Sequence, residues 1–288
     1  MRTYNLLLLA GLLFAVSLTG CKKSSTSAPT AYDNASVLKG GILYNQFYSV
    51  EAGYDTSSYT AHKYKAKSNF FACRACHGWD YKGQGGQYIN RDANGTRPHI
   101  APVDLNEVAL NDAPQDIFDF IKDATGKRDT SYDLSLYNAS SNFTEGDKMP
   151  NFSQILTDAQ IWDLVKFIKE GTWNTDNLYD AVITGTYPTG TITYTNMGKT
   201  GNATNGKAWY ISKCASCHGS TGQGPQLVGP GGTQTLGKYS RLNAGDIHHR
   251  VRYGQLGTYM TPNFQITLAE MQDLYKALSD TLSFPNNP

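Results

Sequence analysis

The pattern Cys-x-x-Cys-His occurs twice in this 288-residue chain, as CRACH at residues 73–77 and as CASCH at residues 214–218. If each pentapeptide is helical, its two cysteines and its histidine stand at positions i, i+3 and i+4 and share one face. Both sulfurs and the imidazole then point at one flat ligand. The two copies use four of the five cysteines. Each half of the chain must therefore fold around the same kind of site.

Two thiols and one imidazole on a helical face are the groups that covalent haem attachment requires, namely two thioether bonds and one nitrogen on the iron. A four-cysteine zinc site and a pair of redox dithiols are the alternatives. The two copies begin 141 residues apart, and His-Gly follows each second cysteine directly. These two features argue against the zinc site and against the redox dithiols. We therefore expect two covalently bound haem c groups. Their predicted attachment and ligand residues are Cys73, Cys76 and His77 in the first copy and Cys214, Cys217 and His218 in the second.

The fifth cysteine, Cys21, follows a segment typical of an exported protein. A short basic start precedes an apolar run at residues 6–16, which is too short to span a bilayer. Residues 18–21 (LTGC) resemble a bacterial lipobox, in which cleavage occurs before a cysteine that carries lipid. We therefore expect a lipoprotein signal peptide at residues 1–20, a lipid on Cys21 and a flexible tether at residues 21–33. The mature protein would be anchored to a bacterial membrane on its periplasmic or cell-surface side.

Composition limits the remaining possibilities. The net charge of +1 gives no support for nucleic-acid binding. Charged residues make up 17% of the chain, below the usual quarter, whereas Tyr (19) and Gly (28) are plentiful. This profile is typical of a soluble, loop-rich protein whose aromatic side chains can line a flat cofactor. The length suits about two domains.

The segments around the two pentapeptides repeat in the same order. A predicted helix precedes each pentapeptide, at residues 34–47 and 206–213. MPNF at residues 149–152 matches MTPNF at residues 260–264, and an amphipathic helix follows each, as at residues 158–169. This internal repeat predicts a mainly α fold with two tandem domains.

The repeat also divides the chain. Residues 182–195 alternate β-forming residues around Pro-Thr-Gly, which predicts a small hairpin between the domains. Polar, non-periodic stretches at residues 50–69 and 127–147 are interpreted as insertions in the first half. The predicted boundaries are 34–172 for the first domain, 173–200 for a linker and 201–288 for the second domain.

Given these motifs, each half resembles a monohaem cytochrome c domain of the His/Met type. In that family an N-terminal helix crosses a C-terminal helix beside the haem. Gly206 and Tyr210 match the glycine and the aromatic residue of that crossing, and Gly41 and Tyr44 match them less closely. Residues 224–227 (GPQL) resemble the loop whose proline carbonyl accepts the Nδ1 proton of the ligand histidine. The first half has PVDL at residues 102–105 instead, so the partner of its histidine stays open.

The resemblance also implies a methionine as the sixth iron ligand, and such a soft, neutral thioether raises the reduction potential. Met149 and Met260 are the candidates, because each precedes a proline and the terminal helix. Met197 and Met271 are interpreted as core residues. Four histidines are expected competitors for the iron: His62, His99, His248 and His249. Two aromatic residues, Trp79 and Tyr239, are candidates to line the haem.

These side chains carry different expectations. His99, on a loop, is the main rival of Met149. His248 and His249 are flanked by arginines and are expected on a solvated basic face. Trp79 and Tyr239 are expected either to reach haem propionates or to pack as ordinary aromatic residues.

The resemblance implies an electron-transfer protein rather than an enzyme: a membrane-anchored dihaem cytochrome c that serves exported redox partner proteins. One alternative is an enzyme, a dihaem peroxidase or a thiosulfate-oxidising cytochrome, which needs an open iron position or a cysteine ligand. No cysteine is spare, and both halves offer a methionine, which favours the carrier. Another alternative is a haem subunit of a respiratory complex.

Overall fold

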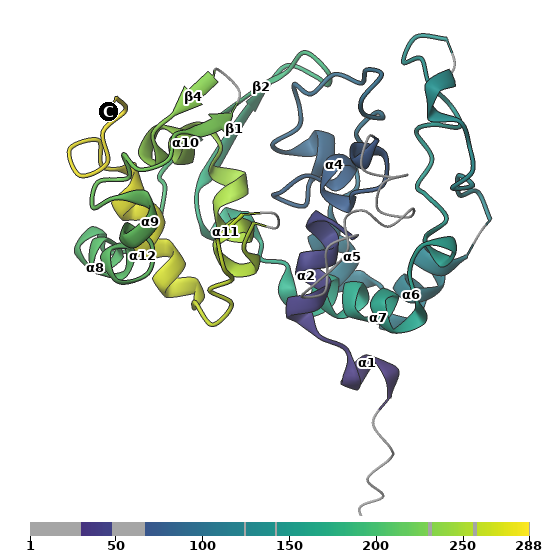
Figure 1. The fold of residues 1–288 in the computed structure, drawn as a ribbon, viewed down its shortest axis with the longest axis horizontal. Coiled ribbons are helices and arrows are strands. Elements are labelled where there is room, and N and C mark those ends of the chain that lie inside the picture. The colour runs from purple at the N-terminus through teal and green to yellow at the C-terminus, as the bar shows by residue number, and fades with distance from the viewer. Residues whose placement is uncertain are drawn as a thin grey trace, which may run out of the picture.

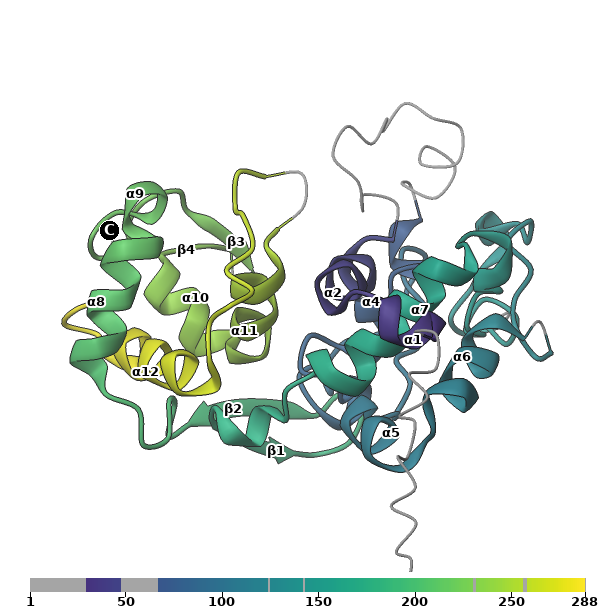
Figure 2. The same ribbon diagram turned by 90° about the horizontal axis from the view of Figure 1, so that it is seen from below.

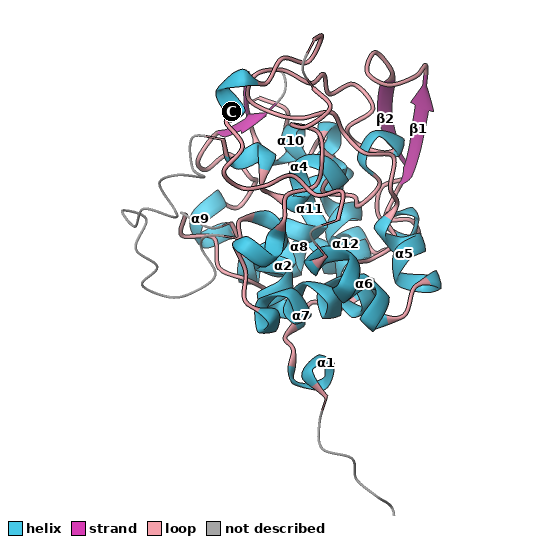
Figure 3. Ribbon diagram, turned by 90° about the vertical axis from the view of Figure 1, so that its right-hand side faces the viewer, coloured by secondary structure: helices cyan, strands magenta, loops and turns pink. Residues whose placement is uncertain are grey.

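A computed structural model describes residues 30–47, 67–123, 125–141, 143–229, 232–255 and 258–287. The described chain forms two helical lobes side by side (Figure 1), which we call domain 1 (residues 30–172) and domain 2 (residues 201–287). A connecting segment, residues 173–200, runs along one side of both lobes and carries the hairpin β1–β2 (Figure 2). Helices make up most of the regular structure (Figure 3).

Domain 1 is entirely helical in its regular structure among the described residues. Its α-helices are α1 (Ala31–Asn34), α2 (Val37–Asn45), α4 (Cys73–His77), α5 (Leu105–Asn111), α6 (Pro114–Lys122) and α7 (Asp158–Lys166), which continues as a π-helical turn (Phe167–Gly171). Short 3₁₀ turns lie at Ser68–Phe70, Gly83–Gly85, Leu134–Leu136 and Phe152–Gln154.

The described residues of the connecting segment and domain 2 form five α-helices, a 3₁₀ turn (Thr175–Asn177) and two small antiparallel hairpins. The strands are β1 (Asp180–Thr184), β2 (Thr191–Thr195), β3 (Leu227–Gly229) and β4 (Gly232–Gln234), with Ile183 opposite Ile192 and Val228 opposite Thr233. The helices of this part are α8 (Ala203–Lys213), α9 (Ala215–His218), α10 (Leu236–Leu242), α11 (Ala244–Tyr253) and α12 (Leu268–Ser279). The predicted mainly α fold and the predicted hairpin are confirmed, whereas the β3–β4 hairpin was not predicted.

One helix crossing organises each domain, α2 against α7 in domain 1 and α8 against α12 in domain 2. A Cβ added to Gly40 would lie 2.0 Å from the carbonyl oxygen of Asp163, and one added to Gly206 would lie 1.9 Å from that of Asp273. Only glycine lets these backbones approach so closely. The glycine of the domain 1 crossing is therefore Gly40. Its neighbour Gly41 instead lies against the ring of Tyr253.

Each crossing is also pinned at its start by a carboxylate. The Asp163 side chain accepts the backbone N–H of Ser36, and the Asp273 side chain accepts that of Asn202, both at 2.6 Å. The second helix of each crossing begins with a capping box, at Thr157 and at Thr267. Such caps stabilise a helix by about 1 kcal/mol. These paired details explain why the sequence repeat is strongest around the two terminal helices.

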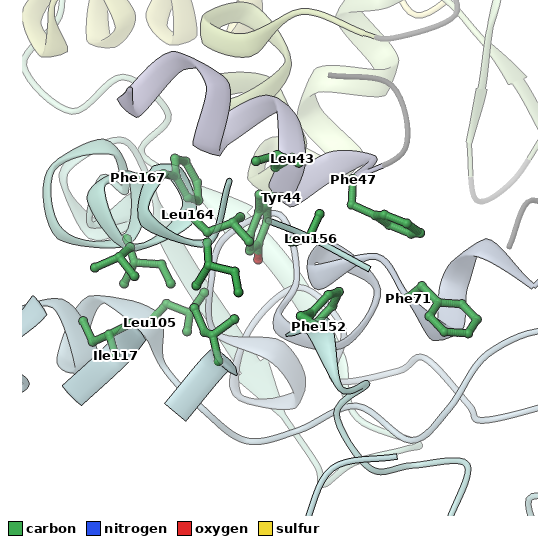
Figure 4. Close-up of a cluster of buried hydrophobic side chains, with 14 of the residues drawn as sticks. Leu43, Tyr44, Phe47, Phe71, Leu105, Ile117, Phe152, Leu156, Leu164 and Phe167 are labelled. Carbon is green, nitrogen blue, oxygen red and sulfur yellow. The ribbon is translucent and has the colours of Figure 1, made fainter. Parts of the chain in front are cut away.

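Apolar side chains from all the main elements of domain 1 meet between its helices (Figure 4). Leu43 and Tyr44 of α2 pack with Leu164 and Phe167 from the region of α7. Full burial of a side chain such as Leu or Phe stabilises the fold by about 1.5–3 kcal/mol. Tyr137, from the polar stretch at residues 127–147, is also buried in this cluster, so the predicted insertion is partly core.

The connecting segment is more than a tether. Leu178, Tyr179 and Met197 are buried in the core of domain 2, and the backbone N–H of Gly198 donates to the Leu178 carbonyl over 2.7 Å. Tyr179 packs against Tyr275 of α12. Met197 and Met271 are thus buried core residues.

Several predictions fall outside the described residues. They are the signal peptide at residues 1–20, the lipid on Cys21, most of the tether at residues 21–33, His62, and most of the insertion at residues 50–69. Within the described ranges, no helix is both long and apolar enough to cross a membrane.

Candidate haem centres

Both pentapeptides are helical. Residues 73–77 form α4, and residues 215–218 form α9, whose N-cap is Cys214. The cysteines and the histidine of each copy therefore share a helical face, as the spacing requires. The four cysteines in the described part of the chain, all from these pentapeptides, are free thiols. The two helices lie in different domains (Figure 1), and the described residues contain no cluster of three or more His, Cys, Asp or Glu suited to a metal ion.

The crossing helix of each domain also holds the end of the pentapeptide. Gly78 and Gly219 follow the two histidines with φ of 77° and 74°, a left-handed conformation that favours glycine. The Tyr44 hydroxyl donates to the Gly78 carbonyl over 2.5 Å, and the Tyr210 hydroxyl donates to that of Gly219 over 2.7 Å. Each tyrosine stands one helical turn after its crossing glycine, so one helix sets both the crossing and the site.

In domain 2 the predicted site residues line one cavity of about 680 Å³. Cys214, Cys217 and His218 border it, and so does Met260. This volume lies in the range of typical ligand pockets. Its walls are largely apolar: Leu227, Leu236, Ile247, Val251, Leu274 and Leu278. A cavity of this size with two thiols, an imidazole and a thioether fits haem c.

Both histidines are held in the neutral form that binds metals. Burial lowers the pKa of His77 to about 4, and it lowers the pKa of His218 as well. The Nδ1 atoms of both rings are buried and have no hydrogen-bond partner. Pro225 lines the domain 2 cavity, yet its carbonyl does not accept from His218 in this structure.

The thiols of Cys73, Cys76 and Cys214 are protonated at neutral pH. Burial raises the pKa of Cys73 and of Cys76 to about 12, and it raises that of Cys214 to about 11. Redox-active dithiols instead have a lowered thiol pKa in an electropositive setting. The electrostatics of these cysteines therefore do not favour the dithiol alternative.

In domain 1 a buried arginine fixes the loop that carries the methionine. The backbone N–H of Arg128 donates to the Met149 carbonyl over 2.9 Å, and the N–H of Asn151 donates back to Arg128 over 2.8 Å. The Arg128 guanidinium donates to the carbonyl of Phe70, just before the pentapeptide, over 2.5 Å. Met149 is half-buried against the core. Sequence reasoning missed Arg128 because it lies in the stretch interpreted as an insertion.

His99, the rival of Met149, is also tied to this loop. Its Nδ1 lies 2.5 Å from Asp147, whose carboxylate also accepts the backbone N–H of His99 over 2.8 Å and the Tyr137 hydroxyl over 2.9 Å. The structure thus brings His99 and Met149 into one loop region.

The expectation of a solvated basic face for His248 and His249 is wrong. Both side chains are fully buried, because α11 packs against domain 1 and not against water. His249 Nδ1 lies 3.0 Å from the Tyr81 hydroxyl of domain 1. Neither histidine lines the domain 2 cavity. They belong to the junction between the domains.

The two aromatic residues considered for haem contact differ. Tyr239 lines the domain 2 cavity, and its hydroxyl donates to Asp246 over 2.5 Å. Trp79 is buried at the junction, where its ring centroid lies 5.0 Å from that of His249.

Comparisons with known families agree with this geometry. Residues 64–172 match the family described as cytochrome c, and residues 201–276 match the family described as cytochrome c oxidase, cbb3-type, subunit III. Searches of curated proteins and of solved structures found no match. The chain contains two cytochrome c domains. Such domains bind covalent haem c and are typical of electron-transfer proteins.

Proposed function

We propose that this protein is a membrane-anchored dihaem cytochrome c that passes electrons between exported redox partner proteins. The observation that carries the proposal is the domain 2 cavity, in which two thiols, a neutral imidazole and a thioether converge. Domain 1 repeats the helical pentapeptide, the tyrosine bond and the crossing glycine. One covalent haem in each domain follows from this repetition.

Each site residue has a distinct role. The cysteine pairs would form the thioether bonds, and His77 and His218 would each supply a nitrogen to the iron. Met149 and Met260 would supply thioether ligands, which favour the ferrous state. Haem c, when bound, contributes an iron that alternates between ferrous and ferric states. The largely apolar walls of the domain 2 cavity would surround the haem there with side chains of low polarity.

Two arguments favour a carrier over an enzyme. Peroxide chemistry needs an open or displaceable iron position, whereas both domains offer a methionine. A thiosulfate-oxidising cytochrome with a cysteine ligand would need a further cysteine, but the four cysteines of the domains all belong to the pentapeptides. The lipobox-like residues 18–21 support anchoring to the membrane.

A second candidate function is a haem subunit of a respiratory complex. It is favoured by the match of residues 201–276 to a family named after an oxidase subunit. Copurification of a stable complex from detergent-solubilised membranes would support this candidate over the free carrier, and an isolated dihaem protein would support the carrier.

The decisive experiment counts covalent haem in the denatured protein. Wild type is expected to carry two haems, and Cys73→Ala/Cys76→Ala and Cys214→Ala/Cys217→Ala one each. Cys21→Ala is expected to release the protein from the membrane with both haems retained. A denatured wild type without covalent haem would refute the proposal, and rapid peroxide turnover would favour the enzyme.

A further inference from the structure

The two domains are in close, specific contact. A Cβ added to Gly41 would lie 2.2 Å from the ring of Tyr253, and one added to Gly245 would lie 2.5 Å from the Gln87 side chain. The Tyr253 hydroxyl donates to the carbonyl of Gly171 in domain 1 over 3.0 Å. Glycines thus allow close approach on both sides of the junction, and the relative position of the two haem centres is set by packed atoms.

Arg250 belongs to both sides of this junction. It lines the domain 2 cavity, and its guanidinium lies over the ring of Trp79 in domain 1, 4.6 Å from the centroid. Asp246 holds the guanidinium at 3.1 Å, and its other carboxylate oxygen accepts a hydrogen bond from Gln87 of domain 1. The wall of one haem cavity is therefore in direct contact with an aromatic ring of the other domain.

Trp79 connects to the first pentapeptide in two ways. It is the second residue after His77, so only Gly78 separates them along the chain. The guanidinium of Arg74, between the two cysteines of the first pentapeptide, also lies over the same ring, 5.2 Å from its centroid. The indole is 4% exposed, so protein atoms and not water surround it. Its ring therefore contacts one arginine from each haem centre, and both pairs are cation–π contacts.

We propose that Trp79 and Arg250 form the path by which an electron crosses between the two haem centres. The inference rests on the proposed function. In this step one electron leaves the reduced centre, which is oxidised, and enters the oxidised centre, which is reduced. No bond forms and no proton moves. Electron tunnelling weakens steeply across empty or water-filled gaps and less across packed atoms, so the contact that joins the cavity wall to the residue beside His77 is the favoured route.

The test measures electron redistribution within the holoprotein. A brief photochemical pulse delivers on average less than one electron per molecule. The redistribution of that electron between the two haems is then followed optically until it reaches equilibrium. Trp79→Leu and Arg250→Gln are expected to slow this step by an order of magnitude, whereas Trp79→Phe retains a ring and most of the rate. A wild-type rate in Trp79→Leu would overturn the proposal.

Arg252→Gln is the matched control. It removes a guanidinium from the same helix and the same junction, where Arg252 donates to Gly171 and lies over Trp173, but it does not line the cavity. Its redistribution rate is expected to stay near that of wild type. If Arg252→Gln slows the step as much as Trp79→Leu does, docking alone sets the rate and the specific path is refuted.

Two further readouts do not depend on electron transfer. Small-angle scattering of each holoprotein reports whether the domains stay docked, so that a rate lost through separation is recognised. The melting temperatures of Trp79→Leu, Arg250→Gln and the double variant form a double-mutant cycle. The melting temperature of the double variant should fall by less than the sum of the two single decreases. Additive decreases would refute an interaction between Trp79 and Arg250. Absence of covalent haem in wild type would instead refute the proposed function.

Discussion

The two domains share one construction at the histidine end of the site and differ at the methionine end. In both, a glycine-mediated crossing and a tyrosine bond hold the pentapeptide. The Met149 carbonyl accepts the N–H of the buried Arg128, whereas the Met260 carbonyl accepts that of Gln255, over 3.0 Å. Gly254, with φ of 75°, makes room beside this second carbonyl.

The comparison shows which parts of the site tolerate change. Pentapeptide, crossing glycine and tyrosine are geometrically coupled, so altering one displaces the others. In each methionine loop the methionine carbonyl accepts one backbone N–H, from Arg128 in domain 1 and from Gln255, beside the Gly254 turn, in domain 2. The two domains thus hold this carbonyl alike, although domain 1 has 21 polar-rich residues, 127–147, before its methionine.

If each methionine binds the iron as proposed, its removal would give the largest effect, because the ligands of the iron change. Met260→Ala should open domain 2 alone, with rapid carbon monoxide binding at one haem and a lowered potential there. Met149→Ala should do the same in domain 1. Optical titration with carbon monoxide and potentiometry measure both. If Met149→Ala leaves the domain 1 spectrum unchanged while His99→Ala alters it, His99 is the ligand there.

Adding a methyl group at each crossing should destabilise both domains. The Cβ atoms of Gly40→Ala and Gly206→Ala would lie about 2 Å from a backbone carbonyl. We expect a loss of about 3 kcal/mol in the unfolding free energy of the holoprotein, since backbone cannot easily yield. Gly95→Ala, where the new Cβ meets no atom within 4 Å, is the control. A similar small change in all three variants would contradict the assignment of the crossing glycines.

Acid should loosen the junction, with opposite contributions from the two domains. Burial, aided by the nearby Arg252 charge, lowers the pKa of His248 to about 3. Between about pH 3 and 6.5 the unfolded chain binds more protons at this residue, so its contribution to stability is lost as the pH falls. From pH 7 to 5 that loss amounts to about 2 kcal/mol.

Asp80 of domain 1 acts in the opposite sense. Burial raises the pKa of its carboxyl to about 6, so between about pH 4 and 6 the folded chain binds more protons and stability grows as the pH falls. This gain offsets about 1 kcal/mol of the histidine loss between pH 7 and 5. Melting temperatures across this range should fall less steeply for His248→Asn than for wild type, and more steeply for Asp80→Asn. Parallel curves for all three proteins would contradict these assignments.

Removing the two tyrosine hydroxyls should give the smallest effect. Tyr44→Phe and Tyr210→Phe each leave one glycine carbonyl without its donor, which costs about 1–2 kcal/mol. Similar losses in the two variants, measured by denaturant unfolding of the holoprotein, would show that the histidine ends are equivalent. A loss confined to one domain would contradict that equivalence.

Local patterns were enough to predict the pentapeptide helices, the amphipathic terminal helices and the β1–β2 hairpin, because each depends on residues close in sequence. The crossing glycine was misplaced by one residue. Gly40 and Gly41 are adjacent, and only the position of α7 distinguishes them. His248 and His249 were misplaced because the polar face of α11 is covered by the other domain, which no periodicity reveals. Arg128 was missed because its partners, Phe70 and Met149, are far away in sequence.

The burial of Leu178 and Tyr179 has a practical consequence for anyone who divides this protein into single-domain pieces. A fragment that begins at residue 201 would lack these two side chains, and the hydrophobic space beside Tyr275 would be left open to water. A fragment that begins near residue 173 would include Leu178 and Tyr179, which cover this space. Proteolytic nicking between the domains would accordingly release an intact second half only if the cut falls before Leu178.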